Sequence, residues 1–353
     1  MSSAALRGGG GRRSPYRRSL RLRLLIVSGM GAALAALMLV DLMTGPSTLS
    51  VADVIAILLG LSDDATAAAI VWSIRLPMTL MAALVGVSLG VAGLQMQTIL
   101  GNPLASPFTL GFSAAAGFGA AVAIMFGGLL PVPGWVAAPA AAFAMTSVAC
   151  LMVYAIAHLR GGRPEVLILG GIAVMFLFQA LQSFLQFLAS PEVLQQIVFW
   201  LFGSLMKASW AGVVVVAAAL AAALPWLARD SWRLTALGLG DAHARSLGID
   251  VAVLRRRVFV LTALLTAAAV AFVGTIGFIG LVAPHAARGL VGEDQRFLLP
   301  LSALAGGGLL LSASIASKVV AQGAVLPVGI VTALVGVPIL CVLVMRRRPG
   351  GSP

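Results

Sequence analysis

Residues 76–99 read LPMTLMAALVGVSLGVAGLQMQTI, and no charged side chain interrupts this run. An α-helix needs about 20 consecutive, mostly apolar residues to cross the hydrocarbon core of a bilayer. Runs of this kind recur along the chain from residue 24 to residue 344. The sequence therefore predicts an all-α polytopic membrane protein, because each such run is long enough to form a spanning helix.

The composition of the chain agrees with this fold class. Of its 353 residues, 60% are hydrophobic and only 10% are charged, and the mean hydropathy is +1.06. A soluble protein has about a quarter of its residues charged. This chain has too few charged residues to cover itself with a water-solvated surface, so a soluble fold is excluded.

Glycine, proline and charged residues divide the apolar sequence into ten predicted spans. The spans cover residues 24–43, 76–99, 109–128, 135–158, 166–188, 209–228, 257–272, 274–291, 298–317 and 327–345. Only Val273 and Gly274 separate the seventh span from the eighth. We expect one transmembrane domain over residues 24–345, between a basic tail at residues 1–23 and a short tail at residues 346–353.

The positions of the basic residues orient these spans. The net charge is +12, and with the N-terminus inside, all of the 23 lysine and arginine residues fall on the inner side except Arg75, Lys207 and Lys318. Cytoplasmic segments carry such an excess of lysine and arginine, so both termini are predicted to be cytoplasmic. The scatter of charges over short gaps excludes a nucleic-acid partner, which would need a contiguous basic surface.

Two segments are predicted to form short helices that do not span. Residues 50–59 (SVADVIAILL) begin with a serine that can cap a helix and have helical apolar spacing. Residues 191–204 (PEVLQQIVFWLFGS) begin with proline and glutamate, which are typical of a first helical turn. We expect both helices on the outer surface of the membrane.

Polar and small residues inside the spans indicate how the helices pack. Gln179, Gln182 and Gln186 share one face of the fifth span, where they either bond neighbouring helices or line a water-filled pathway. Glycines at spacings of three and four predict close helix contacts in the second and eighth spans: Gly86, Gly90, Gly93, Gly274, Gly277 and Gly280. No span centre carries an unambiguous ionisable residue, which argues against an ion-coupled secondary transporter.

The sequence offers no catalytic, metal or nucleotide site. The cysteines and histidines are scattered and lack ligand spacing: Cys150, Cys341, His158, His243 and His285. A phosphate-binding loop of the Walker type needs Gly-Lys-Ser/Thr, whereas Lys207 and Lys318 follow Met206 and Ser317. We expect no catalytic residue, no metal and no bound cofactor, and any ATP that drives this protein would be bound by another subunit.

Several short motifs occur along the chain. They are Arg75-Leu76-Pro77, Asn102-Pro103-Leu104-Ala105-Ser106-Pro107, Phe199-Trp200-Leu201, Leu239-Gly240 with Ala244-Arg245-Ser246-Leu247-Gly248, Gly277-Phe278-Ile279-Gly280-Leu281-Val282-Ala283-Pro284-His285, and Leu326-Pro327-Val328-Gly329. In this order, and over nearly the whole chain, they resemble the permease family of ABC importers for ferric siderophores, haem and cobalamin. The resemblance implies ten spans per subunit, function as a dimer, and residence in the bacterial inner membrane.

The resemblance also implies partners and a mechanism. The partners are a second permease subunit, two ATP-binding subunits that use ATP and Mg, and a periplasmic substrate-binding protein. The substrate would be an iron chelate, a ferric siderophore, with haem and cobalamin as alternatives. ATP would close the ATP-binding subunits and switch the pathway between outward-open and inward-open states, that is, by alternating access. The alternative of a different class is an ion-coupled secondary transporter, which would work without an ATPase.

Arg75 and Lys318 are predicted to dock the binding protein. Both match family positions at which outward-facing basic residues bind carboxylates of that protein, and both are among the outer cations found from the charge distribution. A third basic position of the family is Met78 here, so docking would rest on fewer ion pairs. The alternative for Arg75 is an anchor whose guanidinium reaches the membrane surface.

At the cytoplasmic face the resemblance places two gates and a coupling loop. The gate residues are Asn102 and Leu104 in one gate, and Arg160 and Arg163 in the other. The inner loop at residues 229–256 matches the loop that contacts the ATPase, and its core from Gly238 to Gly248 is expected to form short helices. The predicted contact residues are Leu239, Gly240, Asp241, Ala244, Arg245, Leu247 and Gly248.

Overall fold

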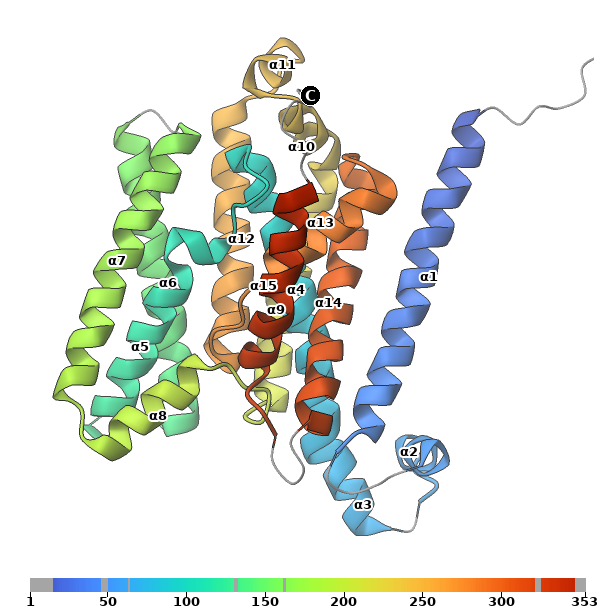
Figure 1. The fold of residues 1–353 in the computed structure, drawn as a ribbon, viewed down its shortest axis with the longest axis vertical. Helices are drawn as coiled ribbons and strands as arrows, with labels where there is room; N and C mark the ends of the chain where they lie inside the picture. Colours follow the sequence, from blue (N-terminus) through green and yellow to red (C-terminus); the bar gives the residue numbers. More distant parts are fainter. Residues whose placement is uncertain are drawn as a thin grey trace, which may run out of the picture.

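All ten predicted spans coincide with helices in the computed structural model (Figure 1), which describes residues 15–45, 50–62, 64–129, 133–160, 163–320 and 325–346. The helices are α1 (Pro15–Met43), α4 (Leu76–Leu100), α5 (Phe112–Phe126), α6 (Gly134–Leu159), α7 (Pro164–Leu188), α9 (Trp210–Arg229), α12 (Val251–Val273), α13 (Ile279–Val291), α14 (Gln295–Val320) and α15 (Val328–Arg346). By length and composition, seven helical stretches in the described ranges can cross a membrane, and α5, α13 and α15 are shorter apolar helices. The chain is an all-helical polytopic membrane protein.

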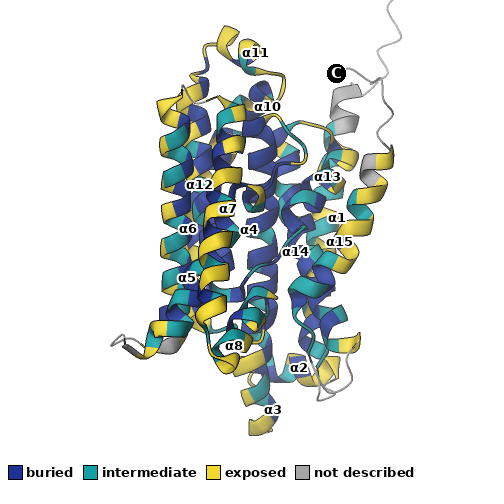
Figure 2. Ribbon diagram, turned by 60° about the vertical axis from the view of Figure 1, so that its left-hand side comes forward, coloured by how far each residue is buried: buried dark blue, intermediate teal, exposed yellow. Residues whose placement is uncertain are grey.

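Helix α4 runs through the centre of the bundle, whereas α1 stands at its edge (Figures 1 and 2). In the most apolar window of the helical stretch Ala65–Leu100, 78% of the residues are buried inside the protein, against 6% for Leu20–Met43 in α1. Helix α4 packs against α14, α12 and α13, and α1 packs mainly against α14. The rest of the chain therefore surrounds α4, whereas it leaves most of the α1 surface uncovered.

Glycines set the distance between the central helices. A Cβ atom at Gly86 would collide with the backbone of Gly306 on α14, and one at Gly93 would collide with the Gly280 carbonyl on α13. Gly90 lies equally close to the Ser302 carbonyl. Small residues let helix backbones approach in this way, so the predicted close contacts at these glycines are confirmed.

The break between α12 and α13 lies at the predicted place but is longer than predicted. Helix α12 ends at Val273, where Gly274 takes a positive φ of 74° and packs against the Trp200 carbonyl. The predicted eighth span began at residue 274, whereas α13 begins at Ile279 after a non-helical segment. A Cβ atom at Gly277 would meet no atom within 4 Å, so the packing role predicted for this glycine is not observed.

At three places the helical segment begins well before the predicted span, namely at α1, α4 and α12. Helix α1 starts at Pro15, inside the predicted basic tail. A short helix α3 (Ala65–Ile70) and a π-helical turn (Val71–Arg75) lead without interruption into α4. Helix α12 starts at Val251, because the side chain of Asp250 caps it by accepting a hydrogen bond from the Val253 amide. The remaining parts of the predicted tails, residues 1–14 and 347–353, lie outside the described residues.

Both predicted non-spanning helices are present at one end of the bundle (Figure 1). They are α2 (Val51–Leu58) and α8 (Pro191–Leu201). Ser50 and Asp53 form a reciprocal capping box at the start of α2, and hydrogen bonds from Ser50 lower the pKa of the Asp53 carboxyl. Two further short helices, α10 (Ser231–Gly238) and α11 (Asp241–Ser246), lie at the opposite end.

Candidate functional site

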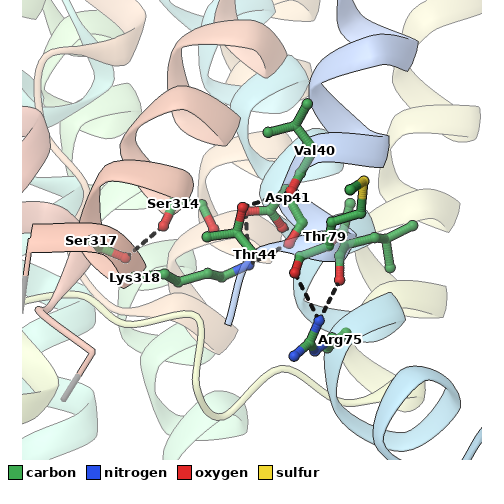
Figure 3. Close-up of polar contacts among 10 residues, drawn as sticks. Val40, Asp41, Thr44, Arg75, Thr79, Ser314, Ser317 and Lys318 are labelled. Atoms are coloured by element: carbon green, nitrogen blue, oxygen red, sulfur yellow. Dashed lines mark hydrogen bonds and ion pairs between the residues drawn. The ribbon is translucent and has the colours of Figure 1, made fainter. Parts of the chain in front are cut away.

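A buried ion pair joins helices α1, α4 and α14 (Figure 3). Asp41 lies in the last turn of α1 and is fully buried. Its carboxylate Oδ1 accepts from Lys318 Nζ of α14 at 2.7 Å, and its Oδ2 accepts from the Thr79 hydroxyl of α4. Only 4% of the Lys318 side chain is exposed. Because Asp41 of α1 bonds to Lys318 of α14 and to Thr79 of α4, these contacts hold α1 against both helices.

Arg75 closes the end of α1 beside this ion pair (Figure 3). Its Nη1 donates to the carbonyls of Leu42 at 2.9 Å and Met43 at 3.0 Å. The last four carbonyls of a helix have no partner within the helix, and a cation there also offsets the helix dipole. Gly45 lies against the guanidinium, and a Cβ atom there would approach Arg75 Nη2 to 2.9 Å. Arg75 is therefore a buried helix cap, 5% exposed.

These positions bear on the predicted docking role. A docking cation must be within reach of a partner protein, whereas the structure buries Arg75 and Lys318 among α1, α4 and α14. Lys207, the third cation predicted to lie outside, is exposed in the structure. Docking through Arg75 and Lys318 thus remains a prediction, and their observed role is to hold α1 in place.

Sequence reasoning missed Asp41. Its signal was present but weak, since one acidic residue near the end of the first span and one lysine near the end of the ninth have no charged neighbours in sequence. Ionisable residues inside spans are expensive unless paired. The two partners are 277 residues apart, so pairing them required the packing of α1 against α14.

At the α10–α11 end, the predicted gate residues Asn102 and Leu104 lie in the turn that follows α4. Gly101 ends α4 with a φ of 59°, and the Asn102 side-chain oxygen accepts from the Leu104 amide at 2.9 Å. The Leu104 side chain is 49% exposed. Asparagine is typical of a turn that bonds its own backbone two residues on. Asn102 thus shapes the turn, and Leu104 projects from it.

The second predicted gate lies where α6 passes into α7. Arg160 follows the last residue of α6 and Arg163 precedes the first residue of α7, and both side chains are exposed. Residues 161–162 between them lie outside the described residues. The structure therefore places both arginines at a helix connection, as the sequence predicted.

The predicted coupling loop at residues 229–256 contains two short helices. Helix α11 lies within the predicted core from Gly238 to Gly248, whereas α10 ends at the first residue of that core. Gly240 and Gly248 take positive φ values of 111° and 77° on either side of α11, a conformation that glycine adopts without steric cost. Leu239 and Leu247 flank α11 and are exposed, at 68% and 51%. Of the seven predicted contact residues, Ala244 is fully buried; it packs within the chain and cannot contact a partner.

The glutamines of the fifth predicted span lie on α7, with Gln179 exposed and Gln182 and Gln186 half-buried. A Cβ atom at Gly117 of α5 would collide with the Gln182 side chain, so Gln182 faces a neighbouring helix. Figure 2 shows exposed residues along the outer side of α7. Gln182 therefore packs against α5, whereas Gln179 is open to the surroundings of this chain.

The model of the FecCD transport family matches residues 33–346 of the chain. The chain belongs to the FecCD transport family. The resemblance drawn from the motifs is thereby confirmed.

Within the described residues no group of three or more His, Cys, Asp or Glu side chains could hold a metal ion.

Named relatives of this FecCD permease cover most of its length. The cobalamin import system permease protein BtuC of Halobacterium salinarum is 38% identical over 284 residues, 80% of this chain and 75% of the relative. The vitamin B12 import system permease protein BtuC of Klebsiella pneumoniae is 37% identical over 283 residues, 80% of this chain and 84% of the relative. A solved ABC transporter, assigned to the metal-chelate type and captured in an inward-facing conformation, is 31% identical with a TM-score of 0.81 and covers 91% of this chain and 99% of its own.

The FecCD permease is therefore the membrane-spanning subunit of an ABC importer. Such subunits leave nucleotide binding to separate ATPase subunits, so this chain is not an enzyme and needs no cofactor of its own. An importer of this type also works with a substrate-binding protein. The sequence-based expectations of an ATPase partner and a binding-protein partner agree with this class.

Proposed function

We propose that this permease imports a metal chelate through a dimer of ten-span subunits, driven by an ATPase that contacts helices α10 and α11. The observation that carries the proposal is the position of these two helices. They project at the end of the bundle opposite to α2 and α8 (Figure 1), and residues 229–256 around them are rich in the arginine typical of cytoplasmic loops.

The α11 region has the chemistry of a protein contact. Leu239 and Leu247 expose apolar side chains beside the charged Arg245, which is 67% exposed. An interface usually combines an apolar centre with a polar rim. We assign Leu239 and Leu247 to the centre of the ATPase contact, with Gly240 and Gly248 shaping the backbone around them.

The gate follows from the same orientation. With α10 and α11 in the cytoplasm, the turn that carries Asn102 and Leu104 faces the cytoplasmic mouth, together with Arg160 and Arg163. Two such turns, one from each subunit, would close the pathway in the outward-open state. In this topology the permease lies in the inner (cytoplasmic) membrane and both of its termini are in the cytoplasm.

The substrate is proposed from the relatives and the sequence together. Two relatives are named for cobalamin or vitamin B12 import and one solved transporter for metal chelates, whereas the sequence resemblance favoured a ferric siderophore. Both are chelated metals carried by a binding protein. The relatives favour cobalamin, and the ferric siderophore remains the second candidate.

The proposal is tested by reconstituting the permease with its ATPase and its binding protein in liposomes. We expect ATP-dependent uptake of one chelate class, measured with cyanocobalamin and with a ferric hydroxamate as separate substrates. Replacing Leu239 and Arg245 together should abolish copurification of the ATPase. Uptake that persists without ATP hydrolysis would contradict the proposal and favour an ion-coupled secondary transporter.

A further inference from the structure

A single buried arginine connects the α11 helix to the end of α4. Arg255 lies in the second turn of α12, and 9% of its side chain is exposed. Its Nη2 donates to Asp241 Oδ1, the first residue of α11, at 2.9 Å. Its Nε donates to the Ile99 carbonyl in the last turn of α4 at 2.8 Å. One guanidinium group thus holds two elements that are far apart in sequence.

The sequence explains why the Ile99 carbonyl needs Arg255 as a hydrogen-bond donor. In a helix this carbonyl would accept from the amide four residues later, but that residue is Pro103, which has no N–H. The amides of Gly101 and Asn102 bond instead to the carbonyls of Thr98 and Gln97. Ile99 is 1% exposed, so without Arg255 a buried carbonyl would lose its hydrogen bond and could not replace it with one to water.

The turn that follows this carbonyl carries the proposed gate. Ile99 precedes Asn102 by three residues, and Gly101 and Asn102 are fixed to the last turn of α4 by the hydrogen bonds described above. A displacement of the Ile99 carbonyl would therefore carry the gate turn with it. Arg255 is rigid enough for this task, since its planar fork presents donors in a fixed geometry, whereas lysine offers one flexible ammonium.

Other polar contacts surround the same end of α4. Arg288 of α13 donates to Gln97 Oε1 at 2.7 Å, and Gln295 of α14 donates to Thr98 Oγ1 at 2.8 Å. Among the described residues, Gln95 Oε1 and Gln97 Nε2 are buried without a hydrogen-bond partner. These two groups could form new hydrogen bonds if the end of α4 shifted relative to its neighbours.

We propose that Arg255 is a positioning residue that transmits movement of α11 to the end of α4, and thereby to the gate turn at Asn102 and Leu104. The inference rests on the proposed function, because α11 moves only if an ATPase subunit acts on it. When α11 moves, Asp241 displaces the Arg255 guanidinium through their ion pair, and Arg255 displaces the end of α4 through its hydrogen bond to the Ile99 carbonyl.

The test uses the complete transporter, with permease, ATPase and binding protein, in liposomes. The variants are Asp241→Asn, which keeps the Arg255 cap on α4 but weakens the link to α11, and Arg255→Lys, which keeps the charge but not the two-sided geometry. The matched control is Arg257→Lys, since Arg257 lies on the same helix and pairs with the buried Asp230 at 2.8 Å. Two quantities are measured: chelate transported per ATP hydrolysed, and the distance between spin labels at Leu104→Cys in the two subunits.

We expect Arg255→Lys and Arg257→Lys to bind the ATPase and hydrolyse ATP as the unmodified protein does. Asp241 is itself a predicted ATPase contact residue, so Asp241→Asn is assayed at a saturating concentration of the ATPase and its transport is expressed per ATP hydrolysed. In Asp241→Asn and Arg255→Lys the transport per ATP should fall by about tenfold or more, and the label distance should no longer change when ATP binds. Arg257→Lys should behave as the unmodified protein. A merely structural cap at Ile99 would leave Asp241→Asn fully coupled, and that result overturns the inference. Failure of the unmodified permease to bind an ATPase would instead overturn the proposed function.

Discussion

Replacing Asp41 by asparagine is expected to destabilise the permease by about 3–5 kcal/mol, because it leaves a buried ammonium without its carboxylate. The Lys318 side chain is 4% exposed and the Asp41 side chain is completely buried, with Nζ and Oδ1 2.7 Å apart. Lys318→Met should cost a similar amount, since it strands the carboxylate. The double variant Asp41→Asn with Lys318→Met contains neither charge, so it should recover most of the loss.

The assay is unfolding in mixed detergent micelles with increasing SDS, followed by the fluorescence of the tryptophans. Lys207→Met serves as the control, because this lysine is exposed and its removal should change the free energy of unfolding by no more than about 0.5 kcal/mol. The reasoning is refuted if either single variant is as stable as the control, or if the double variant loses the sum of the two single losses.

The double variant also separates the structural role from docking. It should be folded but without the Lys318 charge, so its affinity for the binding protein can be measured directly. The burial of Lys318 leads us to expect an unchanged affinity. A loss of about tenfold or more would establish Lys318 as a docking residue, as the family resemblance implies.

Three further predictions concern packing, the ATPase contact and pH. Gly93→Ala should destabilise the protein by about 1–3 kcal/mol in the same unfolding assay, because the added Cβ collides with the Gly280 carbonyl. Leu239→Asp should weaken ATPase association by about tenfold or more, measured by copurification. Hydrogen bonds from Arg296 lower the pKa of Asp294, so its contribution to stability is complete above its ordinary pKa of about 3.9 and is lost as the pH falls through the lower folded-state value. The stability of the unmodified protein should therefore fall more steeply with acid in this range than that of Asp294→Asn.

The helices were predictable from the sequence because lipid enforces a simple rule. A run of apolar residues such as 76–99 must form a helix to satisfy its backbone, and each predicted span has its helix. The first residues of the helices were harder to predict than the helices themselves. The start of α12 at Val251 depends on the Asp250 cap, and the delayed start of α13 at Ile279 depends on Gly274 and the segment after it, which local hydropathy does not register.

The site was predicted unevenly for a related reason. The family motifs predicted that Asn102, Leu104 and the α11 region share one face of the membrane, and the structure has them at one end of the bundle, while their roles remain predictions. Arg255 was missed because its importance comes from Pro103, which removes the usual donor to Ile99, and from Asp241 across a loop. Such contacts join residues that are distant in sequence, and neither periodicity nor charge counting reveals them.

The most direct test of the account is the sidedness of two single cysteines in sealed cells. Lys207→Cys and Leu239→Cys would be introduced separately after replacement of Cys150 and Cys341 by serine, and labelled with a maleimide that cannot cross the membrane. The account predicts labelling of Lys207→Cys from outside and of Leu239→Cys only after the membrane is opened. Labelling of both positions from the same side would contradict the orientation on which the ATPase contact, the gate and the Arg255 link all depend.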